Sequence, residues 1–365
     1  MENQKIRVAI TQGDVNGIGY EVILKTFSDP TMFDLCTPVV YGSPKIMTYH
    51  RKALDLGVTF TIINSPAEIV DGRINVINCN EEEVKVELGR PSPEAGKAAL
   101  DALEKALDDY KKGGFDVLVT APIDKQTIQS DVFHFSGHTE YLEERVGDGN
   151  KALMMLVKDN LRVALVTAHE PLSRVSSLIT QELVKERILQ LARSLRDDFA
   201  LSAPRIGVLA LNPHAGDEGL LGKEEQDIIV PAMAEARAEG ALCYGPFSPD
   251  GFWGSGAYTK FDGILAMYHD QGLIPFKLLA MDEGVNYTAG LTLIRTSPDH
   301  GTAYDIAGKN EASEASFRNA IYQAIDVFRM RRNEKAVHRN PLRKSFFDRR
   351  DDSDKLKLDI NEEQQ

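Results

Sequence analysis

Three histidines are the residues of this chain whose types and positions most directly indicate chemistry. Each follows a short apolar segment of the kind that forms buried strands: His169 follows residues 162–168, His214 follows residues 206–212, and His269 follows residues 263–268. Ligands of open parallel sheets bind beyond the carboxyl ends of the strands, so the three imidazoles could face one crevice. Three imidazoles that leave coordination positions open are typical of a catalytic metal site, and they favour Zn, Co, Ni or Fe over Mg. For each histidine alone, hydrogen bonding within its own loop is the simpler interpretation.

A loop with the sequence Gly137-His138-Thr139-Glu140 precedes a helical stretch. His138 could act as a general acid or bind a substrate, and Thr139 could present its hydroxyl and a helix-start amide to an anion. The alternative is a threonine N-cap beside an exposed histidine. Residue types alone favour this alternative.

Three further polar residues, Lys277, Asn286 and Arg295, follow in the last part of the chain. They have the types needed to clamp a phosphate or carboxylate, because arginine binds two oxygens at once and lysine adds a point charge. We expect Arg295 to end the apolar run that occupies residues 291–294. Solvent exposure is the usual fate of a lysine and is the alternative for Lys277.

Two other segments have the composition of ligand-binding loops. Residues 13–19 contain three glycines between a predicted first strand and a helix that begins at about residue 20. Glycine permits a tight turn or a close ligand approach, but the spacing is not the dinucleotide fingerprint, so an ordinary turn is the simpler interpretation. The second segment is His300-Gly301-Thr302-Ala303.

The elements that must position these residues alternate between strands and helices, which indicates an α/β fold with mostly parallel strands. The predicted strands are residues 6–11, 39–41, 60–63, 116–120, 162–168, 206–212 and 263–268. The predicted helices are residues 93–112, 181–196, 223–239 and 313–332. The clearest helix begins with Ser92 as N-cap and Pro93 at its first position, and Gly113 provides its stop.

Composition excludes several classes of protein. A net charge of −13 leaves no basic excess for binding nucleic acid, and no apolar run approaches the ~20 residues that span a bilayer. Three scattered cysteines (Cys36, Cys79 and Cys243) and an N-terminus without a signal-peptide pattern indicate a cytoplasmic protein. A chain of 365 residues exceeds the usual size of a single core, so two domains are expected.

Five motifs together are similar to those of a known enzyme family, and the similarity spans about residues 7–328. They are GHTE at 137–140, LNPHAGDEG at 211–219, AMYHDQGL at 266–273, GVNYTAGL at 284–291 and IRTSPDHGTAYDIAG at 294–308. With these motifs the chain resembles the 4-hydroxythreonine-4-phosphate dehydrogenases, the NAD-dependent enzymes of vitamin B6 (pyridoxal 5'-phosphate) biosynthesis.

The resemblance implies an isocitrate/isopropylmalate dehydrogenase-like fold, with two α/β/α domains and the active site in the cleft between them. We expect residues 1–130 and 280–340 to form the first domain and residues 131–280 the second, which would hold the metal ligands and the dimer contacts. Residues 341–365 are expected to be a charged, mobile tail. The resemblance also implies a homodimer whose sites use both subunits and a small phosphorylated hydroxy amino acid as substrate. Neither nucleic acid nor a membrane is an expected partner.

The family's functional positions fall mostly on residues already described. The resemblance implies that one divalent metal (Zn, Co or Mg) is held by His169, His214 and His269. It implies that the substrate is bound by His138, Thr139, Lys277, Asn286 and Arg295. It implies that NAD, or alternatively NADP, is bound by Gly13, Gly17, Gly19, His300, Gly301, Thr302, Ala303 and Asp305. His138 and Lys277 are the expected catalytic residues, and the residue that accepts the hydroxyl proton of the substrate is left open.

The reaction implied is the NAD-dependent oxidation of 4-phosphonooxy-L-threonine at C3, followed by decarboxylation to 3-amino-2-oxopropyl phosphate. One alternative is a dehydrogenase acting on 4-phospho-D-threonate or 4-phospho-D-erythronate. Others are a metal-dependent hydrolase, in which the three histidines activate water, and a non-enzymatic protein that binds metal or phosphate. The segment from His300 to Gly308 resembles the adenosine-binding loop of the wider dehydrogenase group. It therefore favours a dehydrogenase, because neither a hydrolase nor a non-enzymatic binding protein needs a binding site for adenosine.

Overall fold

The computed structural model describes residues 5–80, 84–280 and 282–338, and this part of the chain contains one 12-stranded sheet. The order of its strands is β3-β4-β2-β1-β5-β12-β11-β6-β7-β10-β8-β9. The α/β fold class is thereby confirmed. The tail expected at residues 341–365 lies outside the described residues, and the division of the chain into domains at residues 130 and 280 stays a prediction.

The first half of the sheet consists of six strands that are all parallel to one another. In spatial order they are β3 (Phe60–Ile63), β4 (Ile74–Asn78), β2 (Cys36–Gly42), β1 (Ile6–Thr11), β5 (Val117–Thr120) and β12 (Arg295–Pro298). The last of them comes from a distant part of the sequence. Arg295 ends the apolar run of residues 291–294 and is the first residue of β12, and Gly290 reverses the chain before this run at φ 86°.

The second half of the sheet is mixed. In spatial order its strands are β11 (Val285–Ala289), β6 (Leu153–Lys158), β7 (Leu161–Leu165), β10 (Gly263–Ala266), β8 (Arg205–Leu209) and β9 (Leu242–Phe247). β11 is antiparallel to both β12 and β6, and β6 is antiparallel to β7. The adjacent strands β7, β10 and β8 are parallel, so the three segments that precede the strand-end histidines do share one edge of the sheet.

Helices cover both faces of the sheet. The α-helices are α1 (Gly19–Thr26), α2 (Met32–Leu35), α3 (Pro44–Ala53), α4 (Pro93–Lys111), α5 (His138–Val146), α6 (Leu172–Leu178), α7 (Gln181–Asp197), α8 (Val230–Ala238), α9 (Pro249–Gly254), α10 (His269–Ala280) and α11 (Ala315–His338). Short 3₁₀ segments occupy Pro66–Glu68, Pro213–Gly219 and Ala257–Lys260, and a π-helical turn occupies Glu225–Ile229.

Side chains alternate between two faces along each strand, and this alternation separates the apolar clusters. In β1, Val8 and Ile10 belong to the cluster that includes residues of α1 and α11, whereas Ala9 belongs to the cluster that includes residues of α4 and α5. In β6, Met155 joins the first cluster, whereas Leu156 faces α9 and α10. The strongest helix prediction is confirmed, since α4 begins with the Ser92 side chain accepting a hydrogen bond from the amide of Ala95.

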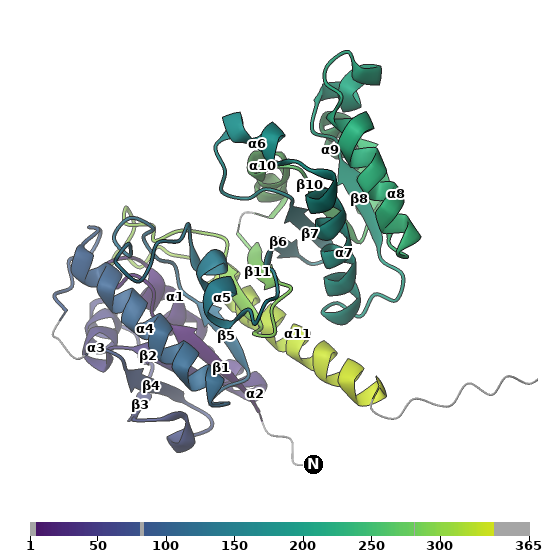
Figure 1. The fold of residues 1–365 in the computed structure, drawn as a ribbon. Helices are drawn as coiled ribbons and strands as arrows, with labels where there is room; N and C mark the ends of the chain where they lie inside the picture. The colour runs from purple at the N-terminus through teal and green to yellow at the C-terminus, as the bar shows by residue number, and fades with distance from the viewer. Residues whose placement is uncertain (1–4, 81–83, 281, 339–365) are drawn as a thin grey trace, which may run out of the picture.

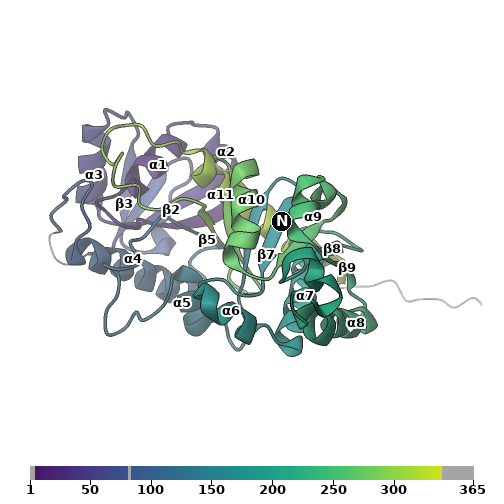
Figure 2. The same ribbon diagram turned by 90° about the horizontal axis from the view of Figure 1, so that it is seen from above.

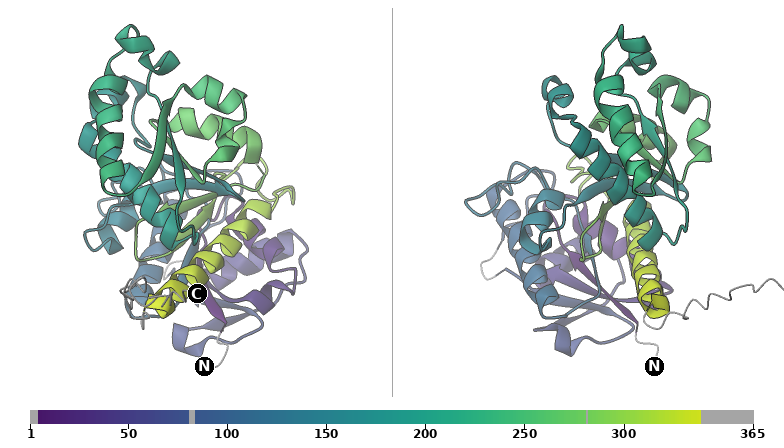
Figure 3. Two further views of the ribbon diagram at one scale, coloured as in Figure 1. Left: turned by 90° about the vertical axis from the view of Figure 1, so that its right-hand side faces the viewer. Right: turned by 45° about the vertical axis from the view of Figure 1, so that its right-hand side comes forward.

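The two halves of the sheet form two lobes of the molecule. Figure 1 shows the first lobe in purple and blue and the second in teal and green, with α11 in yellow beside both. Seen from above, α1 and α4 lie on opposite sides of the strands of the first lobe (Figure 2). Both views of Figure 3 place the green elements at one end and the purple elements at the other. The candidate active site lies where the chain passes from one lobe to the other.

Candidate active site

A cleft of about 260 Å³ collects most of the polar residues that the sequence predicts to be functional. It is lined by the end of β5, the start of α5, the start of α10 and strands β11 and β12. The predicted site residues among its lining are His138, Thr139, His169, His269, Lys277, Asn286, Arg295, His300 and Gly301. Both lobes contribute, because α5 packs on the first lobe and α10 on the second.

Arg295 forms the buried floor of the cleft. Its guanidinium donates hydrogen bonds to the hydroxyls of Thr120 (2.6 Å from Nη2) and Thr288 (3.2 Å from Nη1), and none to a carboxylate of the described residues. Burial lowers the pKa of Arg295 to about 9, and the charge of Glu140 opposes this shift, so the group is still a cation at neutral pH. A buried charge without a counterion is costly. The cleft is therefore suited to receive an anion.

His138 occupies the first position of α5 and is 9% exposed. Its pKa is well below the usual value, first because of burial and then because of the charges of Arg295 and Lys125. The imidazole is therefore neutral near pH 7 and can donate one hydrogen bond and accept another. Thr139 follows it, and the free amides of the first turn favour a bound anion.

Lys277 and Asn286 approach the cleft from α10 and β11. The ammonium of Lys277 lies 3.6 Å from Asp299 Oδ1, and burial raises the pKa of that carboxyl although Lys277 lowers it. Asn286 Oδ1, Asp299 Oδ2 and His300 Nε2 are shielded from solvent and have no hydrogen-bond partner among the described residues. Buried polar atoms of this kind normally have partners. A polar ligand would supply them.

His169 and His269 lie side by side, with 5.9 Å between their ring centroids. Each Nδ1 is bound by a carboxylate: Glu140 Oε1 lies 3.1 Å from His169, and Asp270 Oδ1 lies 2.7 Å from His269. A carboxylate on one ring nitrogen is the usual orienting partner of a histidine that binds metal through the other. The two rings therefore suit a shared metal ion.

His214 does not join them in one chain. It is exposed, it does not line the cleft, and the described residues contain no group of three potential ligands within reach of one ion. It begins a run of five residues, 214–218, with φ between 44° and 81°. Four of these residues are not glycine, and such strained backbone occurs mainly at functional sites. The three-histidine site stays a prediction.

The predicted cofactor loops lie against each other. The amide of Ile18 donates to Thr302 O (3.0 Å), and a Cβ on Gly17 would lie 2.7 Å from the same oxygen. A Cβ on Gly13 would lie 2.3 Å from Pro122 O, and one on Gly19 would lie 2.5 Å from Gln12 O. These three glycines are buried and allow close packing of protein backbone. Asp305, in contrast, is exposed.

Three charged residues of the cleft had no role in the sequence-based prediction: Lys125, Glu140 and Asp299. Lys125 ends the segment Ala121–Lys125, which follows a predicted strand, and Glu140 ends the GHTE motif. The sequence positions of these two residues could therefore have indicated a role in the site. The contacts of Glu140 and Asp299 were not visible in the sequence, because the partner of Glu140 is 29 residues away and the partner of Asp299 is 22 residues away.

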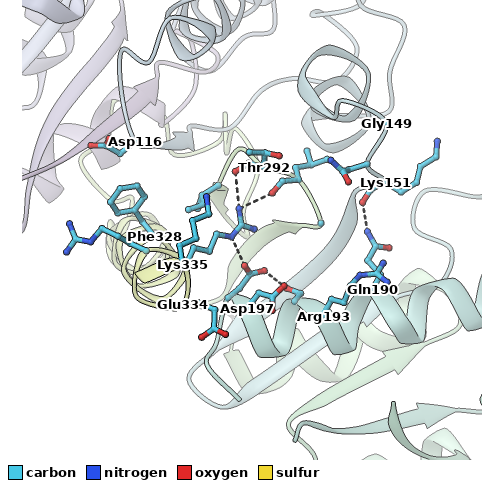
Figure 4. Close-up of a pocket in the computed structure, with 18 of the residues that line it drawn as sticks. Asp116, Gly149, Lys151, Gln190, Arg193, Asp197, Thr292, Phe328, Glu334 and Lys335 are labelled. Atoms are coloured by element: carbon cyan, nitrogen blue, oxygen red, sulfur yellow. Dashed lines mark hydrogen bonds and ion pairs between the residues drawn. The ribbon is translucent and has the colours of Figure 1, made fainter. Parts of the chain in front are cut away.

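A second, larger cavity of about 950 Å³ lies away from these residues. Figure 4 shows it between α11, which carries Phe328 and Lys335, and α7, which carries Gln190 and Arg193. None of the predicted site residues lines it. Cavity size alone therefore does not identify the functional site. We assign the site to the smaller cleft because it contains the predicted residues and the unpartnered polar atoms of Asn286, Asp299 and His300.

The fold and the cleft define an α/β protein with a small polar cleft that contains the buried cation of Arg295. Residues 34–324 match the family model described as pyridoxal phosphate biosynthetic protein PdxA, and the chain belongs to this family. The family resemblance seen in the five motifs is confirmed.

Several relatives have the same name. A 4-hydroxythreonine-4-phosphate dehydrogenase of Bacteroides thetaiotaomicron is 64% identical over 363 residues, covering 100% of both chains. One of Prosthecochloris aestuarii is 42% identical and covers 87% of this chain and 96% of its own. The crystal structure of a 4-hydroxythreonine-4-phosphate dehydrogenase from Klebsiella pneumoniae is 33% identical, with a TM-score of 0.77, and covers 90% of this chain and 99% of its own.

Since these relatives are dehydrogenases, the chain is an oxidoreductase, which argues against the hydrolase and non-enzymatic alternatives. Among the helices that the structure describes, none is long and apolar enough to cross a membrane.

Proposed function

We propose that this chain oxidises 4-phosphonooxy-L-threonine at C3 with NAD and decarboxylates the product to 3-amino-2-oxopropyl phosphate. The observation that carries the proposal is the buried cation of Arg295 at the floor of a cleft that also contains four other family substrate positions. In the first step a hydride leaves C3 for the nicotinamide and the hydroxyl loses its proton. In the second, the C–CO₂ bond breaks, its electron pair moves toward the C3 oxygen, and the enol is then protonated.

The anionic groups of the substrate bind to the cations of the cleft and to the first turn of α5. Arg295 binds the phosphate or the carboxylate, and Lys277 and the start of α5 bind the other anionic group. Asn286 Oδ1, which has no hydrogen-bond partner among the described residues, orients a donor of the substrate. His138 is neutral near pH 7 because its pKa is depressed by burial and by two cations, so it can exchange a proton with the substrate.

The metal is held by His169 and His269 of one chain and by His214 of the partner subunit in a homodimer. The two neighbouring rings with carboxylates on Nδ1 support the first part of this assignment. When bound, a divalent ion supplies a Lewis acid for the oxygen at C3.

The surface around the three histidines supports a second copy of the chain. Leu172, Leu220, Ile274 and Leu278 are each more than half exposed, and each lies within nine residues of one of the histidines. Exposed apolar side chains that form a contiguous patch mark interaction sites, and we propose that these four belong to one. An interface here would bring one chain's exposed His214 to the other chain's cleft.

The adenosine part of NAD binds to the loop from His300 to Asp305, with Asp305 at the ribose. Support comes from the exposed side chain of Asp305 and from the buried glycines, which hold the N-terminal loop beneath residues 300–305. The location of the reaction is the cytoplasm, where three free cysteines persist.

One observation favours a second candidate substrate. An Oceanobacillus iheyensis relative, 36% identical over 329 residues, has the provisional name of a D-threonate 4-phosphate dehydrogenase. The two substrates carry a carboxylate and a phosphate and differ at C2, where an amino group replaces a hydroxyl. Binding of both anionic groups alone does not discriminate between them.

The decisive experiment is the formation of NADH, followed by absorbance, with 4-phosphonooxy-L-threonine, 4-phospho-D-threonate and 4-phospho-D-erythronate as substrates. We expect the highest kcat/KM with the first, and release of CO₂ in equal amount to NADH. A higher kcat/KM with one of the other two would establish the second candidate. No reduction of NAD with any of them would refute both.

A further inference from the structure

Glu140 joins the two sides of the cleft. It lies in the first turn of α5, two residues after His138, and α5 packs on the first lobe. Its carboxylate Oε1 lies 3.1 Å from Nδ1 of His169, which follows β7 of the second lobe. This hydrogen bond therefore connects the helix that presents His138 and Thr139 to the loop of a strand-end histidine.

The hydrogen bond determines the proton position on His169. An ionised carboxylate only accepts hydrogen bonds, so the imidazole carries its proton on Nδ1 and has a free lone pair on Nε2. The ring orientation is then set by a residue 29 positions away in the sequence. A free imidazole would exchange between tautomers and rotate.

Glu140 is less exposed to solvent than the corresponding carboxylate of His269. Asp270 is adjacent to its histidine in sequence and its side chain is 69% exposed, whereas the Glu140 side chain is 36% exposed. The second oxygen of Glu140 is shielded from solvent and has no hydrogen-bond partner among the described residues. A shielded carboxylate oxygen without a hydrogen-bond partner destabilises the fold, which indicates that Glu140 occupies this position for its function.

We propose that Glu140 is a positioning residue that fixes the tautomer and the orientation of His169, so that Nε2 faces the cleft. This inference rests on the proposed metal site. Because the same helix turn presents His138 and Thr139, Glu140 also fixes the distance between the substrate-binding helix and the metal ligand.

The test measures zinc affinity of the purified protein by competition with a chromophoric chelator, without substrate. Glu140→Ala should weaken zinc binding by about 10–100-fold, the usual effect of removing an orienting partner. Glu140→Gln should reduce zinc affinity much less, because its amide oxygen still accepts a hydrogen bond from Nδ1 of His169. Glu144→Gln is the matched control: it lies on the same helix, is exposed, and should bind zinc as the wild type does.

Two outcomes would overturn the inference in distinguishable ways. If His169→Ala binds zinc as tightly as the wild type, the metal site proposed above is wrong and the role of Glu140 falls with it. If zinc binding depends on His169 but Glu140→Ala retains wild-type affinity, only the inference about Glu140 is wrong. Equal losses in the Ala and Gln variants would also overturn it, because the charge and not the hydrogen bond would then be responsible. Thermal unfolding of each variant verifies that α5 is folded.

Discussion

Asp305 is the exposed acidic residue of the loop to which we assign the adenosine ribose, and the structure gives its carboxylate no hydrogen bond or ion pair with a described residue. A carboxylate there accepts hydrogen bonds from the ribose hydroxyls and repels a 2′-phosphate. Asp305→Asn should therefore reduce the preference for NAD over NADP by about tenfold. The measurement is kcat/KM for both cofactors. An unchanged ratio would mean that the loop does not bind the ribose.

His50 is a buried histidine far from the cleft, and it makes stability depend on pH. Its Nε2 donates to Val15 O (2.9 Å), and burial lowers its pKa to about 4. In the unfolded chain a histidine titrates near pH 6.5, so below that pH the unfolded state binds a proton that the folded state does not. The free energy of unfolding is not reduced by His50 above pH 6.5, and protonation of this residue in the unfolded state lowers it by on the order of 3 kcal/mol as the pH approaches 4.

His50→Gln tests this contribution, because glutamine keeps an N–H donor for Val15 but has no charge. The free energy of unfolding, measured by urea titration between pH 6.5 and 4.5, should fall less steeply in the variant than in the wild type. Parallel slopes would show that the pKa of His50 is the same in the folded and unfolded states.

At the residue scale, the sequence predicted which side chains line the cleft but not what they contact. Residue types and motifs are sufficient to identify His138, Lys277, Asn286 and Arg295 as candidates. The absence of a hydrogen bond from Arg295 to a carboxylate of the described residues depends on long-range packing, and so does the hydrogen bond from His169 to Glu140. The roles of the predicted metal, substrate and cofactor residues stay predictions until they are tested.

At the scale of elements, α11 is attached to the second lobe by a buried polar network beside the large cavity. Arg331 Nε donates to Asp198 Oδ1 (2.6 Å) and Nη2 to the hydroxyl of Tyr287 (3.0 Å), which itself donates to Asp198 Oδ2 (2.7 Å). The side chain of Asp198 is 3% exposed. Removing the cation leaves a buried carboxylate without a charged partner.

Arg331→Met should accordingly lower the free energy of unfolding by about 3 kcal/mol. In the double variant Arg331→Met/Asp198→Asn, the decrease in the free energy of unfolding should be smaller than the sum of the decreases in the two single variants, because no unpaired charge remains. Urea titration of the four proteins gives the coupling energy. Additive losses would show that the two side chains do not interact in solution.

Local signals predicted some elements well and others not at all. α4 has an N-cap, an N-terminal proline and one apolar stripe, all of which act within a few residues. β6 was missed because Leu153–Lys158 is a short apolar run, which periodicity alone does not assign to strand or helix. β12 was not predicted, because only its pairing with β5, far away in sequence, shows that a strand starts at Arg295.

At the scale of the whole molecule, a shared site predicts complementation between inactive variants. His169→Ala and His214→Ala should each lack activity as homodimers. In a mixed dimer one site combines both substitutions, and the other combines the intact His169 of one chain with the intact His214 of its partner. Random mixing therefore restores about a quarter of wild-type activity.

NADH formation after co-refolding equal amounts of the two variants measures this recovery. Mixing His169→Ala with His269→Ala is the control, since both residues lie in one chain's cleft and no intact site can form. Recovery in the control, or none in the first mixture, would contradict the shared arrangement.

The strand order has a consequence for synthesis of the chain on the ribosome. β12 and β11 lie between β5 and β6 in the sheet, yet they are the last two strands to be translated among those that the structure describes. Until residue 298 has emerged, β5 and β6 each present an unpaired edge, and such edges are templates for aggregation. At ~5–20 residues per second the delay after β6 is on the order of ten seconds. The antiparallel hairpin of β11 and β12 then closes both edges together, so a nascent chain that stalls before it should depend on chaperones.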